Sequence, residues 1–145
     1  MRKSEQNAFA IAHVKKAFMQ QGFSIEESSA SLGEVNFLAL SGKGLPKKIK
    51  VRSAWKLPNY IFVEKDKFNF KDQELYLAVV YVPDDPKDAI LYVIPAVEWG
   101  KDIYPFKGRD YNKPGQISEP EWGISLCQKA IDAMESYRGL QKVIS

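Results

Sequence analysis

Residues 75–82 read Leu-Tyr-Leu-Ala-Val-Val-Tyr-Val, an apolar run of strand length that lacks the polar alternation of a half-exposed strand. Such a run is typical of a strand buried on both faces, which needs a layer of structure on each side. A loop rich in turn formers follows at residues 83–88, and Ala89–Ile94 is expected to form the next strand, which Pro95 ends. The run therefore predicts a strand near the centre of a sheet in an α/β domain.

Two amphipathic helices are expected to cover this sheet. Apolar residues at helical spacing predict a first helix over residues 5–21. A capping-box pair at Ser118 and Glu121, followed by a second apolar stripe, predicts a closing helix that ends near Gly139. The stripes consist of Ile11, Val14 and Phe18 in the first helix, and of Ile124, Cys127, Ile131 and Met134 in the second.

Four short β segments are expected between the first helix and the central strand. The turn at residues 41–44 predicts that the second and third of them form a hairpin. In the third, the strand period of two places Lys48, Lys50 and Arg52 on one face. The segments are Phe23–Ile25, Val35–Leu40, Lys48–Ala54 and Tyr60–Val63. Residues 100–117 lack clear periodicity and predict a long surface loop.

The composition is that of one ordinary globular domain, expected to span residues 1–145. Hydrophobic residues make up 45% and charged residues 27% of the chain, which argues against a disordered or coiled-coil protein. No apolar run is long enough to cross a membrane. With one cysteine (Cys127) and one histidine (His13), the chain has no internal disulfide and no Cys/His zinc cluster. These features predict a soluble, cytoplasmic protein without a membrane partner.

One long stretch of the chain is basic. Residues 35–63 contain no Asp or Glu, although the whole chain has 18 of them. Cations interleaved with aromatic rings can bind phosphates and stack bases, whereas lysines at a sheet edge can also serve only to prevent aggregation. The candidate nucleic-acid-binding residues are Lys43, Lys47, Lys48, Lys50, Arg52, Trp55 and Lys56.

The order of these elements resembles the PD-(D/E)xK nuclease-like (restriction-endonuclease-like) superfamily. The matching stretches are 35–38 and 49–53, together with Tyr92-Val93-Ile94-Pro95 and Glu98-Trp99. The resemblance implies a restriction-endonuclease-like α/β fold, in which a central mixed β-sheet is flanked by an N-terminal and a C-terminal helix. It also implies a site in which an acid on the second strand faces a Glu-x-Lys or Gln-x-Lys on the third.

The catalytic residues that the resemblance implies are replaced in this chain. Asn36 stands where the family has its metal-binding Asp, and Lys50 and Arg52 stand where it has the second acid and the lysine. Residues 8–10 supply no carboxylate from the middle of the first helix. A lysine in place of a carboxylate turns attraction for a divalent ion into repulsion. No resident metal or cofactor is therefore expected, and magnesium only if the site proves active.

Three functions remain open at this point. The favoured one is a non-catalytic module that binds DNA or RNA through the face with Lys48, Lys50 and Arg52. The second is a protein-interaction or oligomerisation domain, such as a homodimer, that uses the aromatic loop from Gly100 to Trp122. The third is a residual metal-dependent nuclease in which Glu34 replaces the missing acid. His13 is expected to be exposed, Cys127 to pack as a small hydrophobe, and the aspartates at 84, 85 and 88 to form a turn rather than a calcium loop.

Overall fold

The computed structural model describes residues 1–28 and 35–144, which form an α/β structure with two sheets. The main sheet is mixed and has the order β1-β2-β3-β5-β6; β3 and β5 are parallel, and the other neighbours are antiparallel. Its strands are β1 (Ser24–Glu27), β2 (Phe37–Leu40), β3 (Lys47–Trp55), β5 (Leu75–Val82) and β6 (Ile90–Pro95).

The second sheet is antiparallel and has the order β4-β8-β7. It consists of β4 (Asn59–Glu64), β8 (Glu121–Leu126) and β7 (Lys107–Arg109). The helices are α1 (Lys3–Gln20), α2 (Gln128–Ala133) and α3 (Gln141–Ile144), with 3-10 turns η2 (Lys65–Lys67), η3 (Pro86–Asp88), η4 (Ala96–Gly100) and η5 (Glu135–Tyr137).

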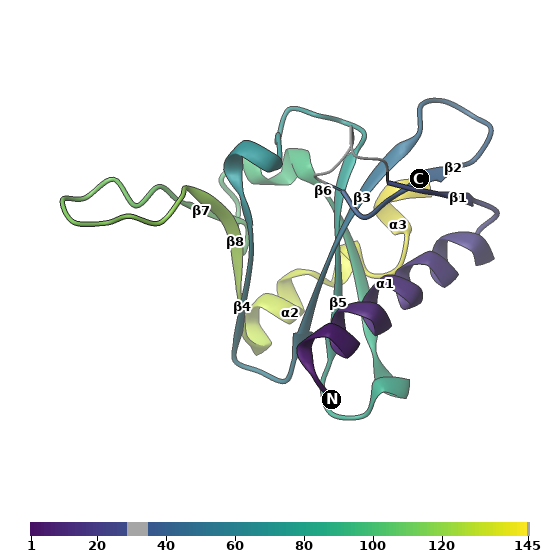
Figure 1. Cartoon of the computed structure of the whole chain (residues 1–145), viewed down its shortest axis with the longest axis horizontal. Coiled ribbons are helices and arrows are strands. Elements are labelled where there is room, and N and C mark those ends of the chain that lie inside the picture. The colour runs from purple at the N-terminus through teal and green to yellow at the C-terminus, as the bar shows by residue number, and fades with distance from the viewer. Residues whose placement is uncertain (29–34, 145) are drawn as a thin grey trace.

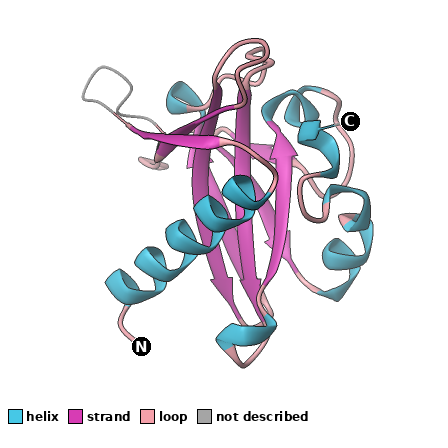
Figure 2. Cartoon of the chain, turned by 90° about the vertical axis from the view of Figure 1, so that its right-hand side faces the viewer, coloured by secondary structure: helices cyan, strands magenta, loops and turns pink. Residues whose placement is uncertain are grey.

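Every residue of β5 is buried, as its sequence predicts. One set of alternate residues, represented by Leu77 and Val79, packs with β4, β8 and α2 in a first core. The other set, represented by Ala78 and Val80, packs with α1 and α3 in a second core. The second sheet and α1 therefore lie on opposite sides of the main sheet (Figures 1 and 2).

The predicted N-terminal helix and hairpin are confirmed. In α1, Ala10, Val14 and Phe18 are buried at helical spacing. Strands β2 and β3 pair antiparallel across the predicted turn, and β3 alternates so that Ile49 and Val51 are buried. The middle strand of the main sheet is β3, and β5 lies next to it. Strand β1 begins at Ser24, one residue later than expected.

The predicted closing helix from Ser118 is wrong in its first half. Residues 121–126 form β8, which pairs with β4 on one side and β7 on the other. Ile124 and Leu126 enter the core at a period of two, so the helical spacing of Ile124 and Cys127 was misleading. Helix α2 begins only at Gln128.

The predicted long loop also needs correction. It contains the short strand β7, and residues 110–120 form an arm between β7 and β8 that extends away from both sheets (Figure 1). Among the described residues, no helix is both long enough and apolar enough to span a membrane.

Candidate functional site

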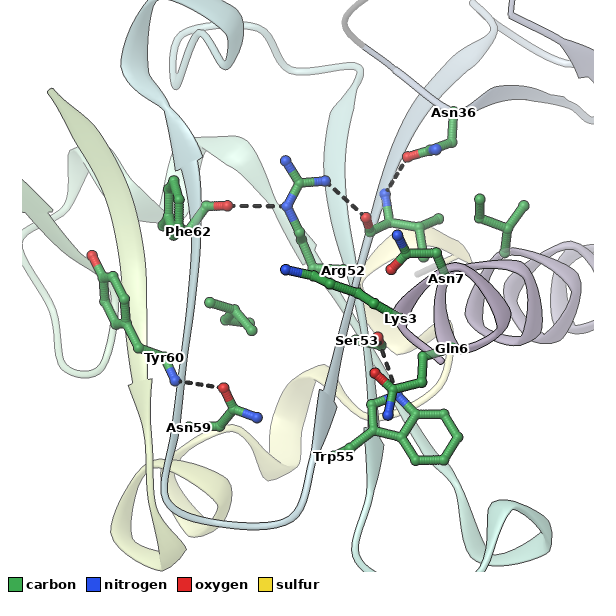
Figure 3. A pocket seen from close by; sticks show the side chains of 13 residues that line it. Lys3, Gln6, Asn7, Asn36, Arg52, Ser53, Trp55, Asn59, Tyr60 and Phe62 are labelled. Atoms are coloured by element: carbon green, nitrogen blue, oxygen red, sulfur yellow. Dashed lines mark hydrogen bonds between the residues drawn. The ribbon is translucent and has the colours of Figure 1, made fainter. Parts of the chain in front are cut away.

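A cleft of about 590 Å³ opens where the N-terminal half of α1 faces the end of β3 and the edge strand β4. The helix contributes Lys3, Gln6 and Asn7, three positions that share a stripe because they are separated by three or four residues. Figure 3 shows these side chains extending from α1 over the cleft, opposite Arg52 and Asn59. The walls therefore combine the N-terminal helix with Asn36 and with the consecutive strands β3 and β4.

Arg52 crosses the gap between the two sheets. Its Nε donates a hydrogen bond to the carbonyl of Phe62 on β4 (3.0 Å), and its Nη1 donates to the carbonyl of Val51 (3.0 Å). Burial lowers the pKa of the guanidinium, an effect that Glu64 opposes. These bonds engage two of the five N–H donors of the group, and the side chain still lines the cleft. Arg52 thus has a structural role in addition to its charge.

The cleft is cationic. Lys3 and Arg52 both line it, and among the residues that the structure describes none of those lining it is an acid. Lys3 is exposed and forms no ion pair with any of the described residues. Two like charges that share one space repel each other, so an anion between them would convert the repulsion into attraction. The amides of Gln6, Asn7 and Asn59 add neutral hydrogen-bonding groups.

Asn36 lines the cleft and also fixes the local backbone. Its side-chain Oδ1 accepts a hydrogen bond from the backbone amide of Val51 (2.7 Å). Its backbone amide donates a hydrogen bond to the Ile49 carbonyl (2.9 Å). Figure 3 shows the bond from the Val51 amide to the Asn36 side chain at the border of the cleft. Of the three positions singled out by the family resemblance, Asn36 and Arg52 therefore line the same cleft, whereas Lys50, which is half-buried, is not among its lining residues.

Trp55 supplies an aromatic wall. Its indole Nε1 donates a hydrogen bond to Ser53 Oγ (3.2 Å), and the ring packs edge-on against Phe9 of α1 with 5.7 Å between ring centroids. These contacts hold the ring in one orientation at the mouth of the cleft. Trp55 is one of the predicted nucleic-acid contacts, and it lines the same cleft as Arg52; its role in binding stays a prediction.

The remaining predicted cations do not gather at the cleft. Lys48 forms an ion pair with Asp72, and Lys47 lies 3.5 Å from a carboxylate oxygen of Glu74. Arg52 is four positions after Lys48 along β3, a distance of about 13 Å. The positive charges of Lys47 and Lys48, at the start of β3, are thus neutralised by acids that lie more than 20 residues later in the sequence.

Lys43 and Lys56 are exposed at opposite ends of β3. Lys43 lies in the turn before β3, where its amide is bound by Ser41 Oγ (3.2 Å). Lys56 directly follows β3 and has a positive φ of 72°. Glu34, the acid of the residual-nuclease hypothesis, lies outside the described residues, so that hypothesis stays a prediction.

The later motif residues have structural roles. Trp99 is buried and donates a hydrogen bond from its Nε1 to the Gly123 carbonyl (3.3 Å). Glu98 is 6% exposed, accepts a hydrogen bond from the Tyr137 hydroxyl (3.0 Å), and lies 2.7 Å from the Lys101 ammonium. Phe106 is also buried, so much of the aromatic segment proposed as an interaction surface lies inside the first core.

The single histidine and cysteine lie apart. His13 is half-buried rather than exposed, stacks on Phe9, and has its pKa lowered by burial and then by Lys16. Cys127 is half-buried directly before α2, with its Sγ 3.7 Å from the Tyr104 hydroxyl. Within residues 1–28 and 35–144, no group of three His, Cys, Asp or Glu side chains could hold a metal ion.

The outer side of β4 carries a second polar feature. The Tyr60 hydroxyl donates a hydrogen bond to Glu121, whose carboxylate is buried. Burial first, and then the Glu121 carboxylate, raise the pKa of the phenol above its ordinary value of 10. Tyr60 therefore stays protonated in the folded chain at a pH at which a free tyrosine ionises.

The chain has no match among the protein-family models or among the curated proteins with which it was compared. The site is therefore defined by its own geometry. Sequence reasoning found Arg52 and Trp55 but missed Lys3, Asn59 and Phe62. No local pattern in the sequence indicates that α1 and β4 meet β3, since this contact depends on the second sheet.

The bridging bond of Arg52 predicts a loss of stability when its donors are removed. Arg52→Met keeps a long side chain but leaves the Phe62 carbonyl without this partner, which is expected to cost about 1–3 kcal/mol of the free energy of unfolding. Lys43→Met is the matched control and should change it by less than about 0.5 kcal/mol. Urea denaturation measures the change in unfolding free energy of both variants. Equal changes would show that the hydrogen bond from Arg52 to Phe62 does not stabilise the fold.

The raised pKa of Tyr60 predicts a stability difference that depends on pH. The unfolded chain ionises this phenol near pH 10, whereas the folded chain keeps it protonated. The contribution of Tyr60 is therefore complete below pH 10 and falls as the pH rises further. The difference in unfolding free energy between the wild type and Tyr60→Phe should shrink from pH 9 to pH 11, and a constant difference would contradict the assignment.

Proposed function

We propose that this chain is a non-catalytic nucleic-acid-binding module, and that its cleft between α1, β3 and β4 holds the phosphate backbone. The observation that carries the proposal is the convergence of Lys3 and Arg52 on a cleft whose lining, within residues 1–28 and 35–144, includes no acid. Phosphate contacts from Lys and Arg provide most of the affinity of nucleic-acid binding when sequence is not read. Trp55, held at the mouth of the cleft, supplies a ring for a base or a sugar.

The cleft replaces the strand face as the proposed contact surface. Lys47 and Lys48 were part of the predicted surface, but their ion pairs with Glu74 and Asp72 must be broken or shared before they bind phosphate. Lys3 needs no such exchange, and the donors of Arg52 that remain after its two backbone bonds are available. The electrostatic attraction for phosphate is therefore concentrated at the C-terminal end of β3, next to the N-terminal half of α1.

The relationship to PD-(D/E)xK nucleases is part of the proposal. Asn36 and Arg52, which stand at two of the motif positions, line the same cleft. In an active nuclease these positions would supply a carboxylate for magnesium and a lysine; here they supply an amide and a guanidinium that stays protonated. This set of groups attracts phosphate, and no carboxylate accompanies it among the described lining residues, which favours binding without cleavage.

Binding through the cleft predicts a specific salt dependence. Fluorescence anisotropy with labelled single-stranded and duplex oligonucleotides should show affinity that falls as salt rises. In Lys3→Gln, the slope of log K against log salt should decrease in magnitude by about 0.7–0.9, the value for one lost phosphate contact. Lys3 is suitable because its side chain is exposed, whereas a change at Arg52 would also disturb the sheets.

The control is Lys43→Gln, which removes the same charge at the far end of the hairpin and should leave the slope unchanged. No binding at low salt would overturn the proposed function. An equal effect of the two variants would show that binding depends on the overall charge of the chain and not on the cleft.

A further inference from the structure

An exposed aromatic surface lies on the outer face of the β4-β8-β7 sheet, opposite to the core. Along β4, Ile61 and Val63 point inward and are 4% and 0% exposed, so the alternation places Tyr60 and Phe62 outside. Phe62 is 45% exposed. We call the surface formed by Tyr60, Phe62 and Arg109 the outer platform.

The two rings of the platform stack on each other. Tyr60 and Phe62 are nearly parallel, with 16° between the ring planes and 5.9 Å between centroids. On the neighbouring strand, a Cβ at Gly123 would lie 2.4 Å from the Tyr60 hydroxyl. A glycine at this position therefore gives the Tyr60 ring the space to lie against the sheet. Phe62 is left with much of its ring open to solvent.

The charge of the platform suits a polyanion. The Arg109 guanidinium lies 4.4 Å from the centroid of Tyr60 and belongs to no ion pair within the described residues. The carboxylates of this face are engaged, because Glu121 is buried against the Tyr60 hydroxyl and Glu64 lies 3.3 Å from the Lys67 ammonium. Stacked rings with an arginine are the groups on which proteins stack nucleobases.

The platform and the cleft share one strand. Strand β4 is at the edge of its sheet, with the cleft on one side and the platform on the other. Tyr60 and Phe62 are also among the residues that line the cleft, but in Figure 3 their rings lie on the side of β4 away from Arg52. Arg52 donates to the carbonyl of Phe62 itself, so the cation and the exposed ring are joined through one residue. A flexible single strand of nucleic acid could therefore pass over the edge of β4 from the cleft to the platform.

We propose that the outer platform stacks the bases of a single-stranded nucleic acid whose phosphates lie in the cleft. This inference rests on the proposed function and adds to it the strandedness of the ligand and a second contact surface. A duplex keeps its bases paired and stacked inside, so it cannot present them to Phe62. A single strand exposes every base and has the backbone flexibility to pass over the edge of β4.

The test compares the full chain with Phe62→Ala, Phe62→Trp and the control Ile117→Ala. Ile117 is 95% exposed on the arm between β7 and β8, so its truncation removes exposed apolar surface outside the platform. The probes are labelled single strands of DNA and of RNA, about 12 nucleotides long, and the corresponding DNA duplex. Anisotropy is measured over a range of salt concentrations, and urea denaturation checks that each variant is folded.

Phe62→Ala is expected to weaken binding of the single strands by about 5- to 150-fold, the range for one lost base stack. The slope with salt should not change, because no phosphate contact is lost. Phe62→Trp should retain or improve the affinity, and Ile117→Ala should match the wild type. The comparison of DNA with RNA identifies which single strand the chain prefers.

Three other results would overturn the inference, and they are distinguishable. If single strands bind but Phe62→Ala and Ile117→Ala have the same affinity, the platform is not used, while binding through the cleft still stands. If the chain prefers the duplex, and Phe62→Ala does not affect its affinity, the ligand is double-stranded and the platform has no part in binding. If neither form binds at low salt, the proposed function fails and the platform with it.

Discussion

The burial of β5 on both faces is the constraint on which the rest of the structure depends. A strand without a polar face must be covered twice, and here α1 and α3 cover one side while a second sheet and α2 cover the other. The parallel pairing of β3 with β5 also requires a connection that crosses from one end of the sheet to the other. Strand β4 forms part of this connection and lies in the second sheet.

The cleft follows from this arrangement. Because β3 and β4 are consecutive in sequence but belong to different sheets, the edge of β4 faces β3 without pairing to it. Arg52 closes part of the gap with a hydrogen bond to β4, and α1 crosses the open end. The same residue thus stabilises the junction of the sheets and gives it a positive charge. Structure and proposed function are coupled at this side chain.

The sequence was informative where one local pattern determined the outcome. The apolar run of β5, the turn before β3 and the stripe of α1 each contain the information for their own structure. Strand β8 was misread because Ile124 and Cys127 also fit a helical period, and its pairing with β4 and β7 outweighed that local signal. The ion pairs of Lys47 and Lys48 depend on acids brought near by the β3–β5 register, and so no local charge pattern predicts them.

Binding of nucleic acid in the cleft between α1, β3 and β4 is tested most directly by a titration followed by NMR. A ¹⁵N-labelled chain with increasing single-stranded DNA should show the largest amide shifts at the residues that line the cleft, such as Lys3, Ser53 and Asn59. Amides near Lys47 and Lys48 should move little. Shifts concentrated at those two lysines, or no shifts at all, would contradict the account.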